Sequence, residues 1–123
     1  MFESTRENRR ARQLADQIKS ELGWLIERKL RDPKKGFITI TRVKLSPDLK
    51  LANVYFSAMG SETERAESET TLKRSGQFLR RELAQRLKIR YVPEIRFFFD
   101  DSLDYAEHIN MLFKKINGAK NSK

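Results

Sequence analysis

Side chains able to carry out acid–base, nucleophilic or metal chemistry are few in this sequence. The only histidine is His108, and there is no cysteine, which excludes thiol chemistry, disulfides and cysteine-ligated zinc. Four acids, Asp100, Asp101, Asp104 and Glu107, have the residue types of a metal site or an acid–base pair. Acids in the first turn of a helix are also ordinary cap and dipole residues. No glycine-rich phosphate loop or nucleophile elbow is present, so we expect no catalytic residue, cofactor or metal.

Basic residues are a better candidate for function. The chain has 26 lysines and arginines against 17 acids, a net charge of +9, which favours a polyanionic partner: nucleic acid first, an anionic membrane surface second. Seven basic residues and a single acid, Glu82, lie between Lys73 and Arg90. The alternative is a solvated surface that only keeps the protein soluble. The clustering favours an RNA-binding patch made of Arg74, Arg80, Arg81, Lys88 and Arg90.

A helix interruption beside these residues extends the candidate site. Gly76 interrupts a helical pattern that resumes with an apolar stripe from Leu79 to Leu87. A helix that restarts after a break exposes N–H groups that bind phosphate. We therefore expect Ser75, Gly76 and Gln77 to contact RNA, with Gly76 setting the directions of the two helical halves. The remaining candidates are basic residues of the first helix and of the turn after it: Arg6, Arg9, Arg10, Lys34 and Lys35.

Hydrophobic periodicity predicts a long first helix. A capping-box spacing of Ser4 and Glu7 starts it near Thr5, and Asp32-Pro33 ends the pattern. Trp24 projects away from the apolar face, and we expect another element to cover it, for instance the C-terminal helix. The apolar face consists of Ala11, Leu14, Ala15, Ile18, Leu22, Leu25 and Ile26.

Two strands are predicted next. The first, over residues 37–45, keeps one core face only if an extra residue forms a β-bulge near Thr41 and Arg42. The second presents alternate residues from Ala52 to Ala58 to the core. The short link between them predicts an antiparallel hairpin.

The rest of the chain supplies three more helical segments and a third strand. A capping box of Ser61 and Glu64 starts a helix over residues 62–74, which Gly76 interrupts. After Pro93, a strand turns Phe97 inward, with Ile95 and Phe99 on the same face. A last helix is expected from residue 101 or 102, ending before Gly118. We expect one domain over residues 1–117, a disordered basic tail over 118–123, no membrane span and a cytoplasmic location.

The predicted fold class is α+β, with helices packed on a three-stranded sheet and a C-terminal helix. This is the KH-like layout of type II topology. KH domains usually clamp single-stranded RNA with a Gly-x-x-Gly loop between two helices. No two of the five glycines are three residues apart, and an interrupted helix-kink-helix takes the place of that loop. Base reading in the standard KH manner is therefore not expected.

Several motifs follow one another along the chain. They are Asp32-Pro33 with Gly36, Ser46-x-Asp48-Leu49, Ala52-x-Val54-Tyr55, Phe78-Leu79-Arg80 and Arg90-x-x-Pro93-Glu94-Ile95-x-Phe97-x-x-Asp100-x-Ser102. Together they resemble the ribosome-binding factor A family, over about residues 6–116. Family members join the helix pair by an Ala-x-Gly kink. The match at Phe78-Leu79-Arg80 places the kink alanine at Ser75 and its glycine at Gln77, so Gly76 falls between them.

The resemblance implies a function that is not enzymatic. It implies a factor that binds the immature 30S small ribosomal subunit and its 16S rRNA and assists late maturation, including processing of the rRNA 5′ end. Such a factor leaves mature subunits and takes part in cold adaptation. It implies a monomer with an assembly GTPase as a further partner and without a small-molecule substrate. Two alternatives stay open: a metal-dependent nucleic-acid hydrolase using the acids near residue 100, and a permanent structural component of the ribosome.

Overall fold

The computed structural model describes residues 5–101. The predicted order of elements is confirmed over this range. The predicted C-terminal helix, the tail and Ser4 of the first capping box lie outside the described residues. The elements are α1 (Thr5–Arg28), a short 3-10 helix η1 (Pro33–Lys35), β1 (Ile38–Leu45), β2 (Leu51–Ala58), α2 (Glu62–Arg74), α3 (Gly76–Leu87) and β3 (Glu94–Phe99).

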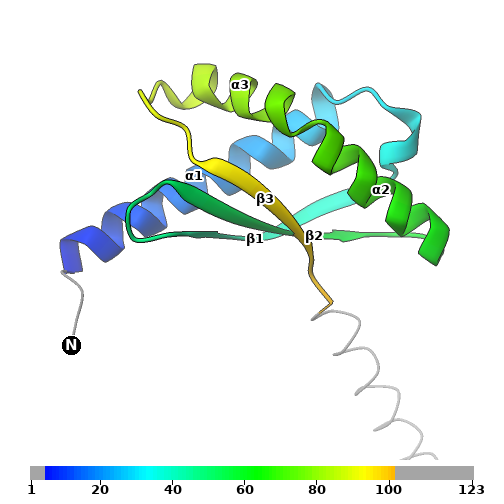
Figure 1. The fold of residues 1–123 in the computed structure, drawn as a ribbon, viewed down its shortest axis with the longest axis horizontal. Helices are drawn as coiled ribbons and strands as arrows, with labels where there is room; N and C mark the ends of the chain where they lie inside the picture. Colours follow the sequence, from blue (N-terminus) through cyan, green and yellow to red (C-terminus); the bar gives the residue numbers. More distant parts are fainter. Residues whose placement is uncertain (1–4, 102–123) are drawn as a thin grey trace, which may run out of the picture.

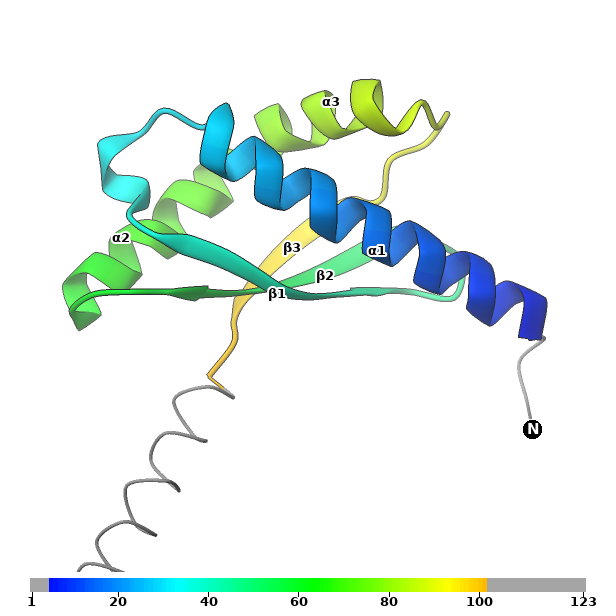
Figure 2. The same cartoon turned by 180° about the vertical axis from the view of Figure 1, so that it is seen from behind.

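The three strands form one sheet in the order β1-β2-β3. The β1–β2 pair is the predicted antiparallel hairpin, whereas β3 runs parallel to β2. A parallel pair requires a crossover, and here the chain makes it through α2 and α3. Figures 1 and 2 show α1, α2 and α3 on the same side of the sheet, and no described element covers the other side.

The predicted β-bulge is present in β1. Ile40 lies opposite Phe56 and Arg42 lies opposite Tyr55, which leaves Thr41 as the extra residue. The Thr41 hydroxyl donates to the Tyr55 carbonyl oxygen at 3.2 Å and to Asp100 Oδ2 at 2.6 Å. The extra residue returns the second half of β1 to the phase in which its apolar side chains face the helices.

A single apolar core lies between the sheet and the helices. Phe97, only 5% exposed, faces inward as predicted and meets Phe56 edge to face, with ring centroids 6.5 Å apart. The predicted inward residues of β2 are all buried. The helices contribute mainly Ile18, Leu22, Leu25 and Ile26 from α1, Leu72 from α2, and Leu79 and Leu83 from α3.

The N-terminus of α2 has the predicted capping box. The Glu64 N–H donates to Ser61 Oγ at 3.2 Å, and the Ser61 N–H donates to Glu64 Oε1 at 3.0 Å. The hydrogen bond from the Ser61 backbone, followed by that from its side chain, lowers the pKa of Glu64 below its ordinary value. A lowered pKa means that this cap strengthens as Glu64 ionises and is lost on acidification.

Within residues 5–101, no helix is long and apolar enough to cross a membrane.

Candidate nucleic-acid interface

The break between α2 and α3 occupies a single residue, Ser75. Its backbone angles are φ −88° and ψ 4°, between the last residue of α2 and the first of α3. The Ser75 N–H donates to the Thr71 and Leu72 carbonyl oxygens at 3.0 and 3.1 Å. Its own carbonyl oxygen accepts from the Leu79 N–H at 2.9 Å. The chain therefore changes direction at Ser75 while the hydrogen bonding of both helices continues, and no side chain caps α3.

The assignment of the break to Gly76 is therefore corrected by one residue. Gly76 is the first residue of α3 and does not have a positive φ. A Cβ built at Gly76 meets no atom within 4 Å, so neither backbone geometry nor space requires glycine there. The glycine marks the region, but Ser75 makes the break. This is the position at which the family resemblance places the kink alanine.

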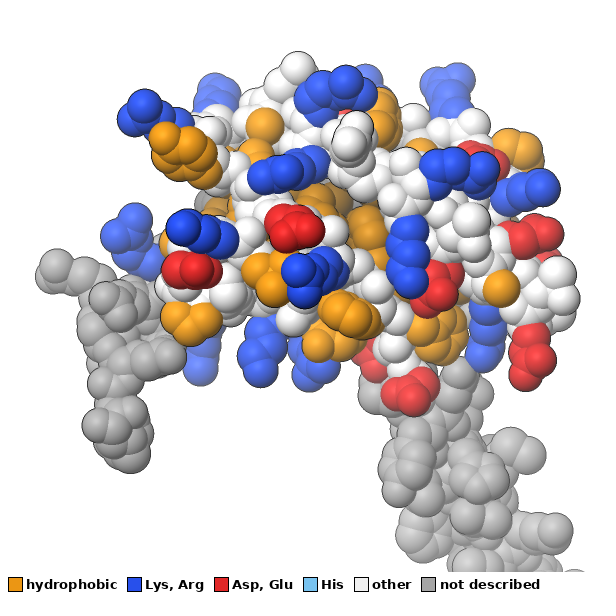
Figure 3. Space-filling view, in the orientation of Figure 1, with side chains coloured by type: hydrophobic (Ala, Val, Ile, Leu, Met, Phe, Trp, Pro, Cys, Tyr) orange, Lys and Arg blue, Asp and Glu red, His pale blue; other side chains and the backbone are white. Residues whose placement is uncertain are grey.

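The five arginines and lysines of the predicted patch all have exposed side chains on α3 or at its ends. We call them the break patch: Arg74, Arg80, Arg81, Lys88 and Arg90. Arg81 and Lys88 are exposed on the side of α3 opposite Leu79 and Leu83, which are fully buried. Lys88 ends the helix in the left-handed conformation, with φ 55°. Figure 3 shows basic side chains gathered over α3, whereas acidic side chains are denser towards the N-terminal end of α2.

Three members of the break patch also have partners within the protein. Arg80 Nη2 donates to the Val92 carbonyl oxygen at 2.8 Å, which ties α3 to the loop before β3. The Arg90 guanidinium lies 5.4 Å from the centroid of the Tyr91 ring. Arg74 Nη2 is 3.8 Å from Asp32 Oδ2, in a pair that is largely exposed. These contacts orient the side chains while leaving them open to solvent.

The two lysines of the turn after α1 have different roles. Lys35 Nζ donates to the carbonyl oxygens of Ile26 at 2.6 Å and Leu30 at 2.7 Å, which satisfies the C-terminal end of α1. Lys35 is therefore held within the fold and is left out of the proposed surface. Lys34 is exposed, and its N–H donates to Asp32 Oδ1. Because Asp32 is also paired with Arg74, Lys34 lies at the same end of the molecule as Arg74.

The basic residues at the start of α1 are not brought to the break. Arg9 and Arg10 are exposed, and the side chain of Arg6 lies outside the described residues. Figures 1 and 2 both place the N-terminal end of α1 away from the junction of α2 and α3. Any contact that these residues make with RNA must therefore involve a separate part of it.

Two basic residues at the break were not singled out from the sequence. Lys73 and Arg96 line a hollow of about 320 Å³ between the break and β3, together with Gly76 and residues 95, 97 and 98. Both side chains are exposed. The sequence does carry a signal for Arg96, since it is a basic residue at an outward position of an aromatic strand. The hollow extends the basic surface from the break to the edge of the sheet.

Trp24 is covered by α3 and remains 37% exposed. The guanidinium of Arg86 lies 4.0 Å from the centroid of the indole ring and is also paired with Glu21 of α1. The predicted C-terminal helix, which was the other candidate for this cover, lies outside the described residues. Arg86 thus joins α3 to α1 and does not belong to the break patch.

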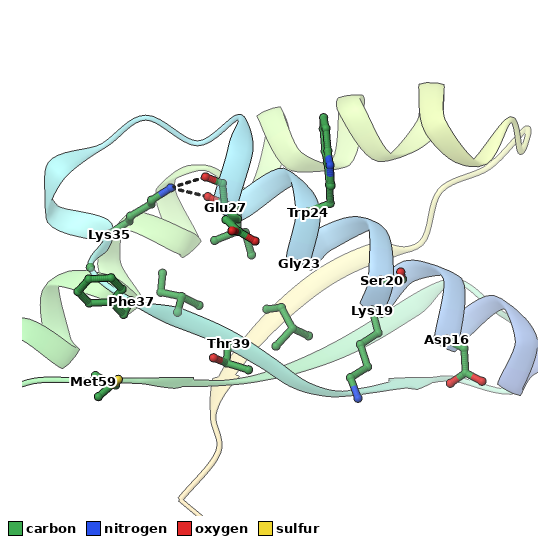
Figure 4. A pocket seen from close by; sticks show the side chains of 14 residues that line it. Asp16, Lys19, Ser20, Gly23, Trp24, Glu27, Lys35, Phe37, Thr39 and Met59 are labelled. Carbon is green, nitrogen blue, oxygen red and sulfur yellow. Dashed lines mark hydrogen bonds between the residues drawn. The ribbon is translucent and has the colours of Figure 1, made fainter.

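Another hollow, of about 1020 Å³, lies away from the break, between α1 and the edge strand β1 (Figure 4). Its polar side chains are of mixed sign, with Asp16, Lys19 and Glu27 on α1. Within residues 5–101 no cluster of three metal-ligating side chains is found. Of the acids near residue 100, Asp100 accepts the Thr41 hydrogen bond, while Asp104, Glu107 and His108 lie outside the described residues.

The sheet, the three helices on one side of it and the single-residue break define the class of the protein as a KH-like α+β domain without a Gly-x-x-Gly loop. Residues 10–113 match the model of the ribosome-binding factor A family. The chain therefore belongs to the ribosome-binding factor A family. The family consists of ribosome assembly factors that are not enzymes, which confirms the prediction about enzymatic activity.

Solved structures support the same assignment. A candidate ribosome binding factor A from Thermotoga maritima is 40% identical, with a TM-score of 0.64 over 72% of this chain and 85% of that one. Ribosome-binding factor A from Thermus thermophilus is 30% identical, with a TM-score of 0.64 over 72% and 93%. A homology model of the Thermus thermophilus factor, fitted into a cryo-EM map of a 30S complex, is 29% identical, with a TM-score of 0.61 over 71% and 91%.

Proposed function

We propose that this protein binds the immature 30S subunit and its 16S rRNA late in assembly and leaves the mature subunit. Family membership supports this proposal, as does the Thermus thermophilus relative fitted into the map of a 30S complex. The proposal includes assistance to processing of the rRNA 5′ end, a cytoplasmic location and a role in cold adaptation. It also includes a monomeric state and an assembly GTPase as a partner in release.

The observation that carries the proposal is the exposed basic surface along α3. The break patch places five cations on or beside one twelve-residue helix, and Lys34, Lys73 and Arg96 extend it around the break. Each cation that neutralises a phosphate releases condensed counterions, so such a surface binds the RNA backbone with a strong dependence on salt. Phosphate contacts fix register and orientation and carry no base identity. The expected mode of action is to hold an rRNA segment in one conformation.

The test is binding to purified precursor small subunits. The variant Arg81→Ala with Lys88→Ala removes two exposed charges, and the charge-matched control is Lys120→Ala with Lys123→Ala near the C-terminus. Exposed substitutions usually change stability by no more than about 0.5 kcal/mol, so the fold of the patch variant should be retained. We expect the patch variant to bind precursors more weakly than the control. Equal losses from both pairs would show that the charge acts only as a diffuse field.

The two alternative functions predict other results. A permanent ribosomal component would be found mainly in mature translating subunits, whereas the proposed factor should be enriched on precursors. A nucleic-acid hydrolase would cleave RNA as the pure protein when a divalent metal is added. Sedimentation of cell extracts followed by detection of the protein, together with an RNA cleavage assay, separates the three functions.

A further inference from the structure

The face of the sheet that the helices leave open combines aromatic rings with positive charge. Side chains that alternate with the core residues point to this face. On β1 they include Arg42 and Lys44, on β2 Asn53 and Tyr55, and on β3 Arg96 and Phe98. The strand register lines them up in two adjacent rows across the sheet: Arg42, Tyr55 and Phe98 in one, and Lys44, Asn53 and Arg96 in the other.

The first row consists of three flat groups that contact one another in succession. The Tyr55 and Phe98 rings have centroids 5.6 Å apart and planes inclined by 31°. The Arg42 guanidinium lies over the Tyr55 ring, 4.4 Å from its centroid. Phe98 is 42% exposed although its ring is large and apolar. Aromatic rings and guanidinium planes are the groups on which unpaired nucleobases stack.

The second row supplies charge beside the rings. Lys44 and Arg96 of this row are exposed, and so is Arg42 of the first row. Glu94 is an acid on this face, and its Oε2 is 3.8 Å from Arg96 Nη2 in a largely exposed pair. Asp100 lies at the end of the sheet, where it accepts the hydrogen bond of the Thr41 hydroxyl. The centre of the face is therefore positive and matches a polyanion that also carries flat apolar groups.

We infer that the open face of the sheet is a stacking platform for unpaired RNA bases, with Phe98 and Tyr55 as the rings and Lys44 and Arg96 as phosphate contacts. This inference rests on the proposed function and names a second surface for it. The two surfaces are continuous, because the hollow at the break is lined by Lys73 on the helix side and by Arg96 and Phe98 on β3. An unpaired segment that leaves the break patch reaches the platform over the edge of β3.

Charge distinguishes this occupant from the other candidate, the apolar face of residues 103–116 of the same chain. That segment begins just beyond β3 and has apolar residues at helical spacing. An apolar helix over the platform would remove Arg42, Lys44 and Arg96 from water and would not supply an acidic partner for each of them. Burial of unpaired charge is costly. A phosphodiester backbone pairs with these charges while its bases cover the rings.

The test uses the full chain and a twelve-nucleotide single-stranded oligoadenylate with one 2-aminopurine, a base whose fluorescence falls when it stacks. Phe98→Leu keeps apolar bulk and removes the aromatic face, whereas Phe98→Tyr keeps the ring. The matched control is Phe37→Leu, which alters an aromatic residue that is 79% exposed and lies just before β1. We expect Phe98→Leu to weaken binding about tenfold and to reduce the quenching, with the salt slope unchanged because no charge is removed. Phe98→Tyr and Phe37→Leu should behave as the wild type does.

The inference is overturned if Phe98→Leu and Phe37→Leu give the same affinity and quenching. A second measurement needs no variant: photo-crosslinks from a 4-thiouridine oligonucleotide should map to the peptides that contain Tyr55 or Phe98. Nuclear Overhauser contacts between the Phe98 ring and residues 103–116 that persist with RNA bound would assign the face to the chain itself and also overturn it. If these tests contradict the platform but the protein binds precursor subunits, the proposed function still stands. If bases stack on the platform but the protein does not bind precursor subunits, only the proposed function is overturned.

Discussion

At the scale of single residues, Phe97 tests the placement of the core. Its ring packs against Phe56 and is nearly inaccessible, so Phe97→Ala should lower the free energy of unfolding by about 3–5 kcal/mol. Phe98 is adjacent in sequence and faces the open side of the sheet, so Phe98→Ala should cost clearly less. Urea denaturation measures the stability of both variants, and midpoints can be compared directly where the m values are equal. Equal midpoints for Phe97→Ala and the wild type would contradict the inward placement.

Two glycines give a second prediction at this scale. Gly76 has no positive φ and open space around it, so Gly76→Ala should raise the unfolding free energy by about 0.4–1 kcal/mol by restricting the unfolded chain. Gly36 has φ +65°, and a Cβ there would lie 3.1 Å from Ser68 Oγ, so Gly36→Ala should destabilise the protein. Thermal unfolding of both variants is the measurement. A loss of stability in Gly76→Ala would contradict this prediction and would mean that the break requires glycine at position 76.

At the scale of elements, hydrophobic periodicity predicts most of the fold, whereas residue types and their spacing predict less of the candidate site. The phase change in β1 requires an extra residue, and Thr41 is that residue. The parallel direction of β3 has no local signal, because it depends on how the helix pair crosses the sheet. The sequence predicts the break at the residue with the highest backbone freedom, whereas the structure makes it at Ser75. The roles of Lys35 and Arg86 arise from tertiary contacts that spacing along the chain does not reveal.

The contact between α1 and α3 gives a prediction at the element scale. Arg86 covers the Trp24 ring and is paired with Glu21, so Arg86→Ala should expose the indole to water and shift its emission to longer wavelength. The chain has one tryptophan, so the emission reports this site alone. Arg81→Ala removes the same charge from the exposed side of α3 and should leave the emission unchanged. An identical spectrum for the wild type and Arg86→Ala would mean that another element covers the ring.

At the scale of the whole molecule, the break patch and the sheet platform bind one RNA through different interactions, namely phosphate contacts and base stacking. The patch binds phosphates, and its contribution falls at high salt because counterion release then yields less free energy. The rings contribute by stacking, which depends little on salt. The two surfaces lie on different sides of the molecule and meet at the hollow lined by Lys73 and Arg96. One precursor subunit therefore has to present a phosphate backbone and an unpaired stretch close to each other.

This combination predicts how variants combine on precursor subunits. Arg81→Ala with Lys88→Ala should reduce the slope of log affinity against log salt by roughly 0.7–0.9 for each phosphate that is no longer neutralised. Phe98→Leu should lower affinity at every salt concentration and leave the slope as it is. Because the altered side chains lie on different surfaces of the protein, the losses in binding free energy should add to within about 0.5 kcal/mol in the triple variant. Titrations across a series of salt concentrations measure all of these quantities. A triple variant no weaker than the patch variant would mean that RNA held by the break patch does not reach the platform.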